Sequence, residues 1–265
     1  MDICCLIPKE IENLVLLRYL SISSGARHVI PADSICNLGN LETLDMRNSK
    51  IECLPKGIWK LQKLRHLYLD GPTYLPSTDN EAGLPNLQVL TGVSLDCYKT
   101  DSLFAQARFP NLRKLEFYGL GAQQLLILKM SSILPLRHLQ TLKLRKHIGL
   151  SNPSSLQSTL TKITVLDVNM LSLPGYLPSI WKVLGSLTNL RILKIVNCNR
   201  ITLHCDESSF CQLEVLKMRE VTNMGWNMEK GAMPRLQRLV LERCRFDMIH
   251  VEEIYCLTAL RVWKF

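Results

Sequence analysis

Residues 51–69 read IECLPKGIWKLQKLRHLYL, and the end of this stretch carries the pattern that decides the fold. Leu64 is followed by Leu67 three positions later and by Leu69 five positions later. Because side chains alternate along a strand, Leu67 and Leu69 should point to one face while His66 and Tyr68 point to the other. One such strand cannot bury its apolar face alone. The pattern therefore predicts a strand that stacks on copies of itself.

The same pattern returns along the chain at steps of 23–27 residues, which is the period of a leucine-rich repeat. We place its first apolar residue at eleven positions: Leu17, Leu41, Leu64, Leu87, Leu112, Leu139, Ile163, Leu190, Leu213, Leu236 and Leu260. The expected fold is α/β, a leucine-rich repeat solenoid (horseshoe) of about eleven irregular repeats. Its parallel sheet should be concave, with short helical, 3₁₀ or loop segments on the convex side.

One domain is expected over residues 1–265, with two styles of repeat. The repeats within 1–70 are regular, and those within 71–265 are irregular. A polar loop is expected over 71–83. Gly92 stands where the fourth motif needs an apolar residue, which predicts a short or bent strand there.

The cysteine and hydropathy patterns indicate the cellular location of the chain. The sequence has no apolar run of 18 or more residues and no apolar h-region within its first twenty residues, so neither membrane insertion nor a secretory signal is expected. Its 10 cysteines form no Cys-x-x-Cys pair, and no Asn-x-Ser/Thr glycosylation site occurs. Cys198 and Cys244 follow the central leucine of a motif by five positions, where a buried thiol is expected. These features favour a reducing, cytoplasmic location, with the nucleus also open.

Catalytic and metal-binding motifs are absent from the sequence. The six histidines do not fall in a His-Glu-x-x-His or Cys/His metal-ligand spacing. The sequence also lacks a Gly-x-Ser-x-Gly turn and a phosphate-binding Gly-x-x-x-x-Gly-Lys-Ser/Thr loop. We therefore expect a protein that is not an enzyme, with no metal site.

The chain is positively charged, and the expected open face of its strands is net positive. The formal net charge is +9. Basic residues expected on that face are Arg47, Lys114, Lys143, Arg145, Lys194, Lys217, Arg219, Arg238 and Lys264, against Asp45, Asp70, Glu116, Asp167 and Glu242. An acidic protein surface is the favoured partner; nucleic acid is not, because the chain has no Lys/Arg run and no RNA-binding aromatic motif. The alternative is that these are simply solvated charges.

Several motifs resemble those of a known family. The early repeats contain Leu17-Arg18-Tyr19-Leu20, Leu41-Glu42-Thr43-Leu44-Asp45 and Ile51-x-x-Leu54-Pro55-x-x-Ile58-x-x-Leu61-x-x-Leu64-Arg65-His66-Leu67. Later repeats contain Pro110-Asn111-Leu112-Arg113-Lys114-Leu115 and Met233-Pro234-Arg235-Leu236-Gln237-Arg238-Leu239. Together they resemble the repeat domain of plant intracellular nucleotide-binding leucine-rich repeat immune receptors of the coiled-coil class. The resemblance covers essentially the whole chain.

This resemblance implies a function and partners. The chain would be a fragment that lacks the switch domain, so ADP or ATP is expected only in that separate domain and no cofactor is expected here. The repeats would restrain the switch in cis and sense a pathogen effector, or a host guard target protein that the effector has altered. Other implied partners are the receptor's own coiled-coil and nucleotide-binding domains. The alternative is a free-standing intracellular repeat scaffold or adaptor, or a truncated decoy.

Two groups of residues are assigned to these partners. The resemblance implies that Arg18 and Arg65, with Arg47 nearby, receive an acidic motif of the coiled coil, because an arginine fork can pair a carboxylate bidentately. Glu42 stands at the matching position of the second repeat and departs from an all-arginine pattern. For the outside partner we select residues of the concave C-terminal repeats, namely Lys194, Lys217, Arg219, Arg238 and, as a rim contact, Trp226. Trp263 stands in a leucine position and is expected in the core.

Overall fold

The computed structural model describes residues 5–25, 29–30, 33–77, 83–94, 104, 108–118, 126–129, 133, 135–146, 148–151, 160–166, 178–248 and 257–264. The chain forms two compact units. Unit 1 comprises Met1–Tyr118 and Ser132–Leu139, and unit 2 comprises Gly119–Ser131 and Gln140–Phe265.

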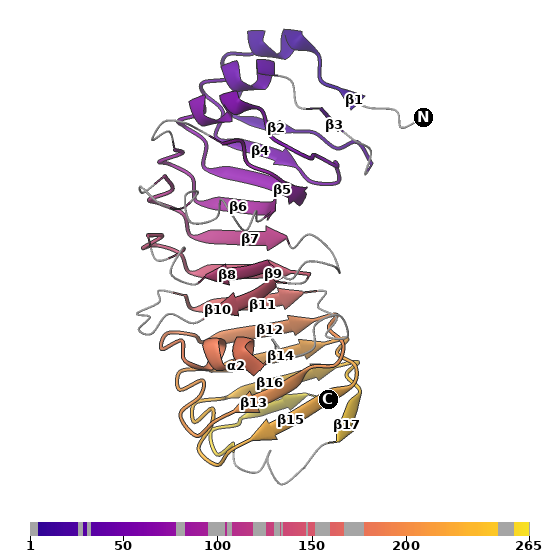
Figure 1. Cartoon of the computed structure of the whole chain (residues 1–265). Helices are drawn as coiled ribbons and strands as arrows, with labels where there is room; N and C mark the ends of the chain where they lie inside the picture. Colours follow the sequence, from indigo (N-terminus) through magenta and orange to yellow (C-terminus); the bar gives the residue numbers. More distant parts are fainter. Residues whose placement is uncertain are drawn as a thin grey trace. The chain divides into compact units, whose positions relative to one another are not determined.

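Unit 1 is a parallel sheet backed by short 3₁₀ helices (Figure 1). Its main sheet has the order β2 (Tyr19–Ser21), β4 (Thr43–Met46), β5 (His66–Thr73), β6 (Val89–Ser94) and β7 (Lys114–Tyr118). The helices η1 (Lys9–Asn13), η2 (Asp33–Asn37) and η3 (Lys56–Lys60) pack on one another in sequence order. The short strands β1 (Cys5–Leu6) and β3 (Val29–Ile30) form a separate pair. Each 3₁₀ helix precedes a strand of the main sheet, as the repeat pattern predicts.

The core of unit 1 is a ladder of leucines. The strand register places Leu44, Leu67, Leu90 and Leu115 beside one another, and each is at most 1% exposed. Burial of such a side chain contributes about 1.5–3 kcal/mol. Because each rung contacts only its neighbours, this stabilisation is distributed along the sheet.

Two glycines change the sheet of unit 1 where the sequence is irregular. Strand β5 continues through Gly71 to Thr73, so the predicted polar loop starts later than expected. Residues 78–82 of that loop lie outside the described residues. Gly92 has a φ of +75°, and the register shifts between Leu90 and Val93. Strand β6 therefore contains a bulge, which agrees with the predicted bend. The strand is not short, because it spans Val89–Ser94.

Unit 2 contains a parallel sheet and a second sheet. The main strands are β9 (Thr141–Arg145), β11 (Lys162–Leu166), β12 (Ile192–Val196), β14 (Val215–Arg219), β16 (Arg238–Glu242) and β18 (Val262–Lys264). The second sheet consists of β13 (Thr202–Cys205), β15 (Met224–Met228) and β17 (Phe246–Met248). Strand β8 (Leu126–Lys129) pairs with β10 (Ile148–Ser151), and helix α2 (Pro178–Gly185) packs on β10 and β13.

The register corrects the seventh repeat. Ile163 pairs with Leu142 on one side and Leu193 on the other, so it is the central residue of its motif. The motif therefore begins at Leu160, three residues earlier than predicted. Apolar residues occur at both spacings in this segment, and an odd shift exchanges the two faces of a strand. Thr164 consequently lies on the open face, and the predicted open-face residue Asp167 lies outside the described residues.

The turns behind the strands of unit 2 repeat one conformation. Asn197, Glu220 and Arg243 each follow a strand directly and have φ values of 52–54°. The thiol predictions fall in the same turns. Cys198 is 2% exposed and donates to the Val196 carbonyl oxygen at 3.2 Å, which confirms a buried thiol. Cys244 is half-buried, and this burial raises the pKa of its thiol.

Candidate recognition surface

The open face of the main sheet in unit 2 carries a row of lysines. The register aligns one residue from each strand, in the order Lys143, Thr164, Lys194, Lys217, Val240 and Lys264. We call these six positions the lysine row. Lys194 and Lys217 are half-buried and stand on the adjacent strands β12 and β14. Neighbouring strands are about 4.8 Å apart, so the backbones that carry the Lys194 and Lys217 side chains lie close together.

Two further rows flank the lysine row. Toward the strand starts lie Thr141, Lys162, Ile192, Val215, Arg238 and Val262. Toward the strand ends lie Arg145, Val196, Arg219 and Glu242. The face therefore mixes cationic and aliphatic side chains. Among these described positions Glu242 is the only carboxylate.

Lys217 and Lys194 differ in how their charges are compensated. The Lys217 ammonium lies 3.1 Å from Glu242 Oε1, and this hydrogen bond lowers the pKa of the Glu242 carboxyl. Lys194 has no ion pair with any residue that the structure describes. Burial, followed by repulsion from Lys162, Lys217 and Lys143, lowers the pKa of Lys194. Lys194 is thus a half-buried cation among like charges.

The structure places four of the five predicted C-terminal residues together. Lys194, Lys217, Arg219 and Arg238 all lie on the open face of β12, β14 and β16. Arg219 forms an ion pair with Glu220, because its Nη2 lies 3.2 Å from Glu220 Oε1. The fifth residue, Trp226, is a correction.

Trp226 is a core residue and not a rim contact. It lies on β15 of the second sheet and is 6% exposed. The alternating burial along β15 explains this, because Met224, Trp226 and Met228 all point to the inner side. Trp263 is corrected in the opposite direction, since it is 50% exposed on β18 although its motif predicts a core position.

The arginines predicted to receive the coiled coil lie beside a carboxylate in unit 1. Arg18, Glu42 and Arg65 each precede a strand, and backbone hydrogen bonds of 2.8 Å link Glu42 N to Arg18 O and Arg65 N to Glu42 O. The Glu42 carboxylate lies 3.6 Å from Arg18 Nη1 and 3.8 Å from Arg65 Nε. The two arginine side chains remain 77% and 55% exposed. Glu42 therefore bridges the two arginines instead of merely interrupting them.

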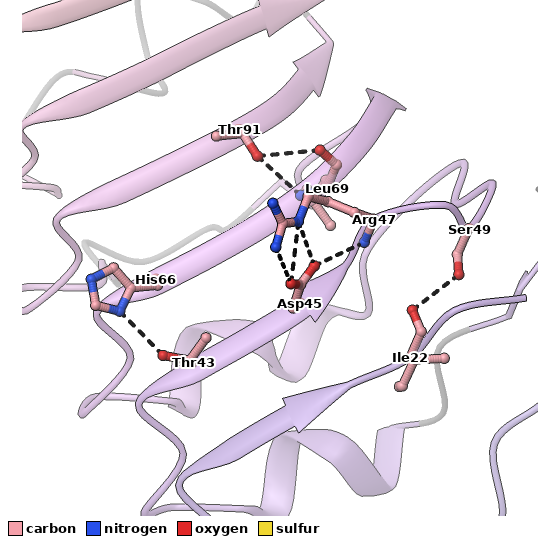
Figure 2. A network of polar contacts seen from close by, with 8 residues as sticks. All are labelled: Ile22, Thr43, Asp45, Arg47, Ser49, His66, Leu69 and Thr91. Carbon is pink, nitrogen blue, oxygen red and sulfur yellow. Dashed lines mark hydrogen bonds and ion pairs between the residues drawn. The ribbon is translucent and has the colours of Figure 1, made fainter.

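Arg47 belongs to a different network, shown in Figure 2. It follows strand β4, and its Nε donates to Asp45 Oδ1 at 2.9 Å. The hydrogen bonds from Arg47 lower the pKa of the buried Asp45 carboxyl. The guanidinium also lies 4.8 Å from the centre of the Tyr68 ring, which stacks on His66. Sequence spacing alone did not reveal that Arg47 is held by Asp45.

In the part of the chain that the structure describes, no helix is long and apolar enough to cross a membrane. No group of histidine, cysteine and acidic side chains in those ranges could hold a metal ion.

Comparison with solved structures supports the fold. An internalin, InlF from Listeria monocytogenes, has a TM-score of 0.58 and 18% identity, covering 97% of this chain and 69% of its own. The plant peptide hormone receptor RGFR1 in complex with RGF2 has a TM-score of 0.53 and 17% identity, covering 100% of this chain and 46% of its own. At these identities the likeness concerns the fold alone, a parallel-sheet solenoid.

Sequence comparison identifies the family. A putative late blight resistance protein homolog of Solanum demissum is 29% identical over 94% of this chain and 20% of its own length. The ToMV susceptible protein tm-2 of Solanum lycopersicum is 29% identical over 89% of this chain and 31% of its own length. This similarity confirms the resemblance of the chain to plant resistance proteins. The chain spans a fifth to a third of the length of these relatives. A family model described as "Leucine-rich repeat region" matches residues 4–177, well over half of the chain, and the chain belongs to the leucine-rich repeat family.

Proposed function

We propose that this chain is the protein–protein recognition module of a plant disease-resistance receptor. It senses a pathogen effector, or a host protein that an effector has modified, and restrains a nucleotide switch in cis. The observation that carries this proposal is its similarity to resistance proteins over 94% of its length. The open face of unit 2 supports it, because it presents cationic and aliphatic side chains over several adjacent strands.

The same proposal assigns no chemistry to the chain itself. We propose that it is not an enzyme and that ADP or ATP is bound only by a separate switch domain. It acts in the cytoplasm or the nucleus, and the free thiols of the described Cys36, Cys211 and Cys244 support a reducing environment. Its partners are proteins and not nucleic acids.

Restraint in cis is assigned to the bridge of Arg18, Glu42 and Arg65. An acidic motif of the coiled coil would displace Glu42 from the two exposed arginines. Arg47 is the weakest member of this group, because Asp45 already neutralises it. A bound motif can restrain the switch only by its difference in affinity for the resting and the active states.

The test of sensing uses the natural gene product in its own plant. A variant that combines Lys217→Glu and Arg219→Glu is compared with Lys182→Glu, which changes an exposed lysine on helix α2 of the same unit. Plants are challenged with a panel of pathogen isolates, and cell death is scored. We expect the double variant to lose responses that the Lys182→Glu control retains. Responses equal to wild type across the panel would contradict the assignment.

The test of restraint uses the same gene product without a pathogen. Arg18→Glu together with Arg65→Glu should release the switch and cause cell death in uninfected leaves. Lys9→Glu, an equal charge change on the exposed surface of η1, is the control for one site and should remain silent. Silence of both variants at equal protein levels would argue against restraint through these arginines.

A further inference from the structure

The lysines of the lysine row are not required by the geometry of the sheet. The same row contains Thr164, which is 5% exposed, and Val240, which is 8% exposed. These β-branched residues are typical of strands and pack well on a pleated surface. The backbone at Lys194 has the same register and could accommodate either of them. The choice of lysine therefore needs another reason.

Lysine at position 194 also works against the stability of the fold. The Lys194 side chain is half-buried, and its ammonium lies near three other lysines and has no ion pair among the described residues. Burial of an unpaired charge costs free energy, and like charges nearby add to that cost. Lys217 avoids this cost through Glu242, at 3.1 Å. Residues that break a local rule without compensation within the fold are expected where a protein binds something.

The neighbours of Lys194 indicate the chemistry of the missing partner. Ile192 and Val196 flank it on its own strand, and Val215 stands on the next strand; all three are half-buried. A carboxylate would neutralise the ammonium, while aliphatic side chains of the same partner would cover these residues. Single-stranded nucleic acid would instead require aromatic rings for base stacking. The described positions of this open face contain none.

We propose that the lysine row of unit 2 binds an acidic protein segment that also carries aliphatic side chains, with Lys194 as its central contact. This rests on the proposed role of the chain in protein recognition and specifies the partner's chemistry. The segment supplies carboxylates to Lys194 and to the neighbouring lysines of the row. It lays its aliphatic side chains over Ile192, Val196 and Val215.

The experiment measures binding of labelled synthetic peptides to the whole chain by fluorescence polarisation. The probe is a peptide with three copies of Glu-Glu-Val-Leu. One comparison peptide has Gln in place of every Glu, and a second comparison ligand is an oligothymidine of similar length. We expect the acidic peptide to bind more tightly than both. Equal binding of the Glu and Gln peptides, or tighter binding of the oligothymidine, would overturn the proposal.

Variants then assign the binding to Lys194. Lys194→Met should weaken binding of the acidic peptide by about fivefold or more, which corresponds to about 1 kcal/mol. The same variant should raise the melting temperature, because it removes an uncompensated charge. Lys182→Met on helix α2 removes an equal charge from the same unit and should leave the affinity unchanged. Lys194→Gln, which keeps a polar side chain, serves as a second variant. Wild-type affinity in both Lys194 variants would refute the assignment.

The two proposals can fail separately. If the acidic peptide binds as predicted but the charge-reversed plant variants respond normally, immune recognition fails while the inferred binding chemistry stands. If those plant variants lose their response but the acidic and Gln peptides bind alike, the recognition surface stands and the inferred acidic partner is wrong.

Discussion

The Lys217 ammonium donates a hydrogen bond to the Glu242 carboxylate across the adjacent strands β14 and β16, at 3.1 Å. This pair uses the only carboxylate among the described open-face positions of unit 2. Glu242 thereby compensates one lysine and leaves its neighbour Lys194 without a partner in the described chain. The open face consequently retains a positive centre that an acidic ligand can neutralise.

Glu242→Gln should increase the affinity for the acidic peptide. The substitution keeps the shape of the side chain but removes the negative charge that competes with the ligand for Lys217. The effect should diminish at high salt, because exposed charges are screened. Fluorescence polarisation at low and high salt measures both effects. Glu207→Gln, on the exposed turn before β14, is the matched control. An unchanged or lower affinity for Glu242→Gln would show that this carboxylate does not compete.

The destabilising effect of Lys194 should depend on pH. Burial and nearby ammonium groups lower the pKa of Lys194 from its ordinary value of 10.5. Between the lowered pKa and 10.5 the unfolded chain binds more protons than the folded chain, so the free energy of unfolding rises with pH there. Lys194→Met removes this dependence. Its advantage over wild type should be largest at neutral pH and shrink as the pH approaches 10.5. Urea unfolding at several pH values measures it, and a constant or growing advantage would exclude this explanation.

Gly92→Ala should destabilise unit 1 more than Gly25→Ala. Both glycines have positive φ, +75° and +64°, where an alanine costs about 1–2 kcal/mol. A Cβ at position 25 would meet nothing within 4 Å. At position 92 it would lie 2.8 Å from Leu69 Cβ and still nearer the Leu69 carbonyl group. Urea unfolding of the two variants isolates the effect of this overlap. Equal losses would mean that the bulge in β6 can relax.

Trp226→Ala should unfold more easily than Trp263→Ala. Trp226 is 6% exposed, and removing a buried tryptophan costs about 3–5 kcal/mol. Trp263 is 50% exposed, so its removal leaves a smaller cavity and a smaller loss. Thermal unfolding of both variants provides the comparison. If Trp226→Ala were as stable as wild type, its placement in the core of unit 2 would be wrong.

Ladder positions were predictable wherever the motif was unambiguous. The residues Leu44, Leu67 and Leu142 stand in the register that the repeat predicts, because each is the sole good match to a leucine position. In the seventh repeat, Ile163 and Leu166 both satisfied the spacing, and only pairing with Leu142 and Leu193 selected Ile163. The open-face residues Lys194, Lys217 and Arg238 followed from correct registers. Trp226 did not, because it belongs to a second sheet whose alternation is not part of the leucine motif.

The sequence by itself determined the repeat, the direction of its leucines and the basic character of its open face. These properties depend on spacing within one repeat, and apolar burial enforces that spacing. Only the tertiary structure decided which charges are neutralised: Glu42 between Arg18 and Arg65, Asp45 at Arg47, and Glu242 at Lys217. Most of these pairs join residues that lie more than twenty positions apart in sequence and meet only when one repeat stacks on the next. The unpaired state of Lys194 has the same origin, because it depends on what the neighbouring strands place beside it.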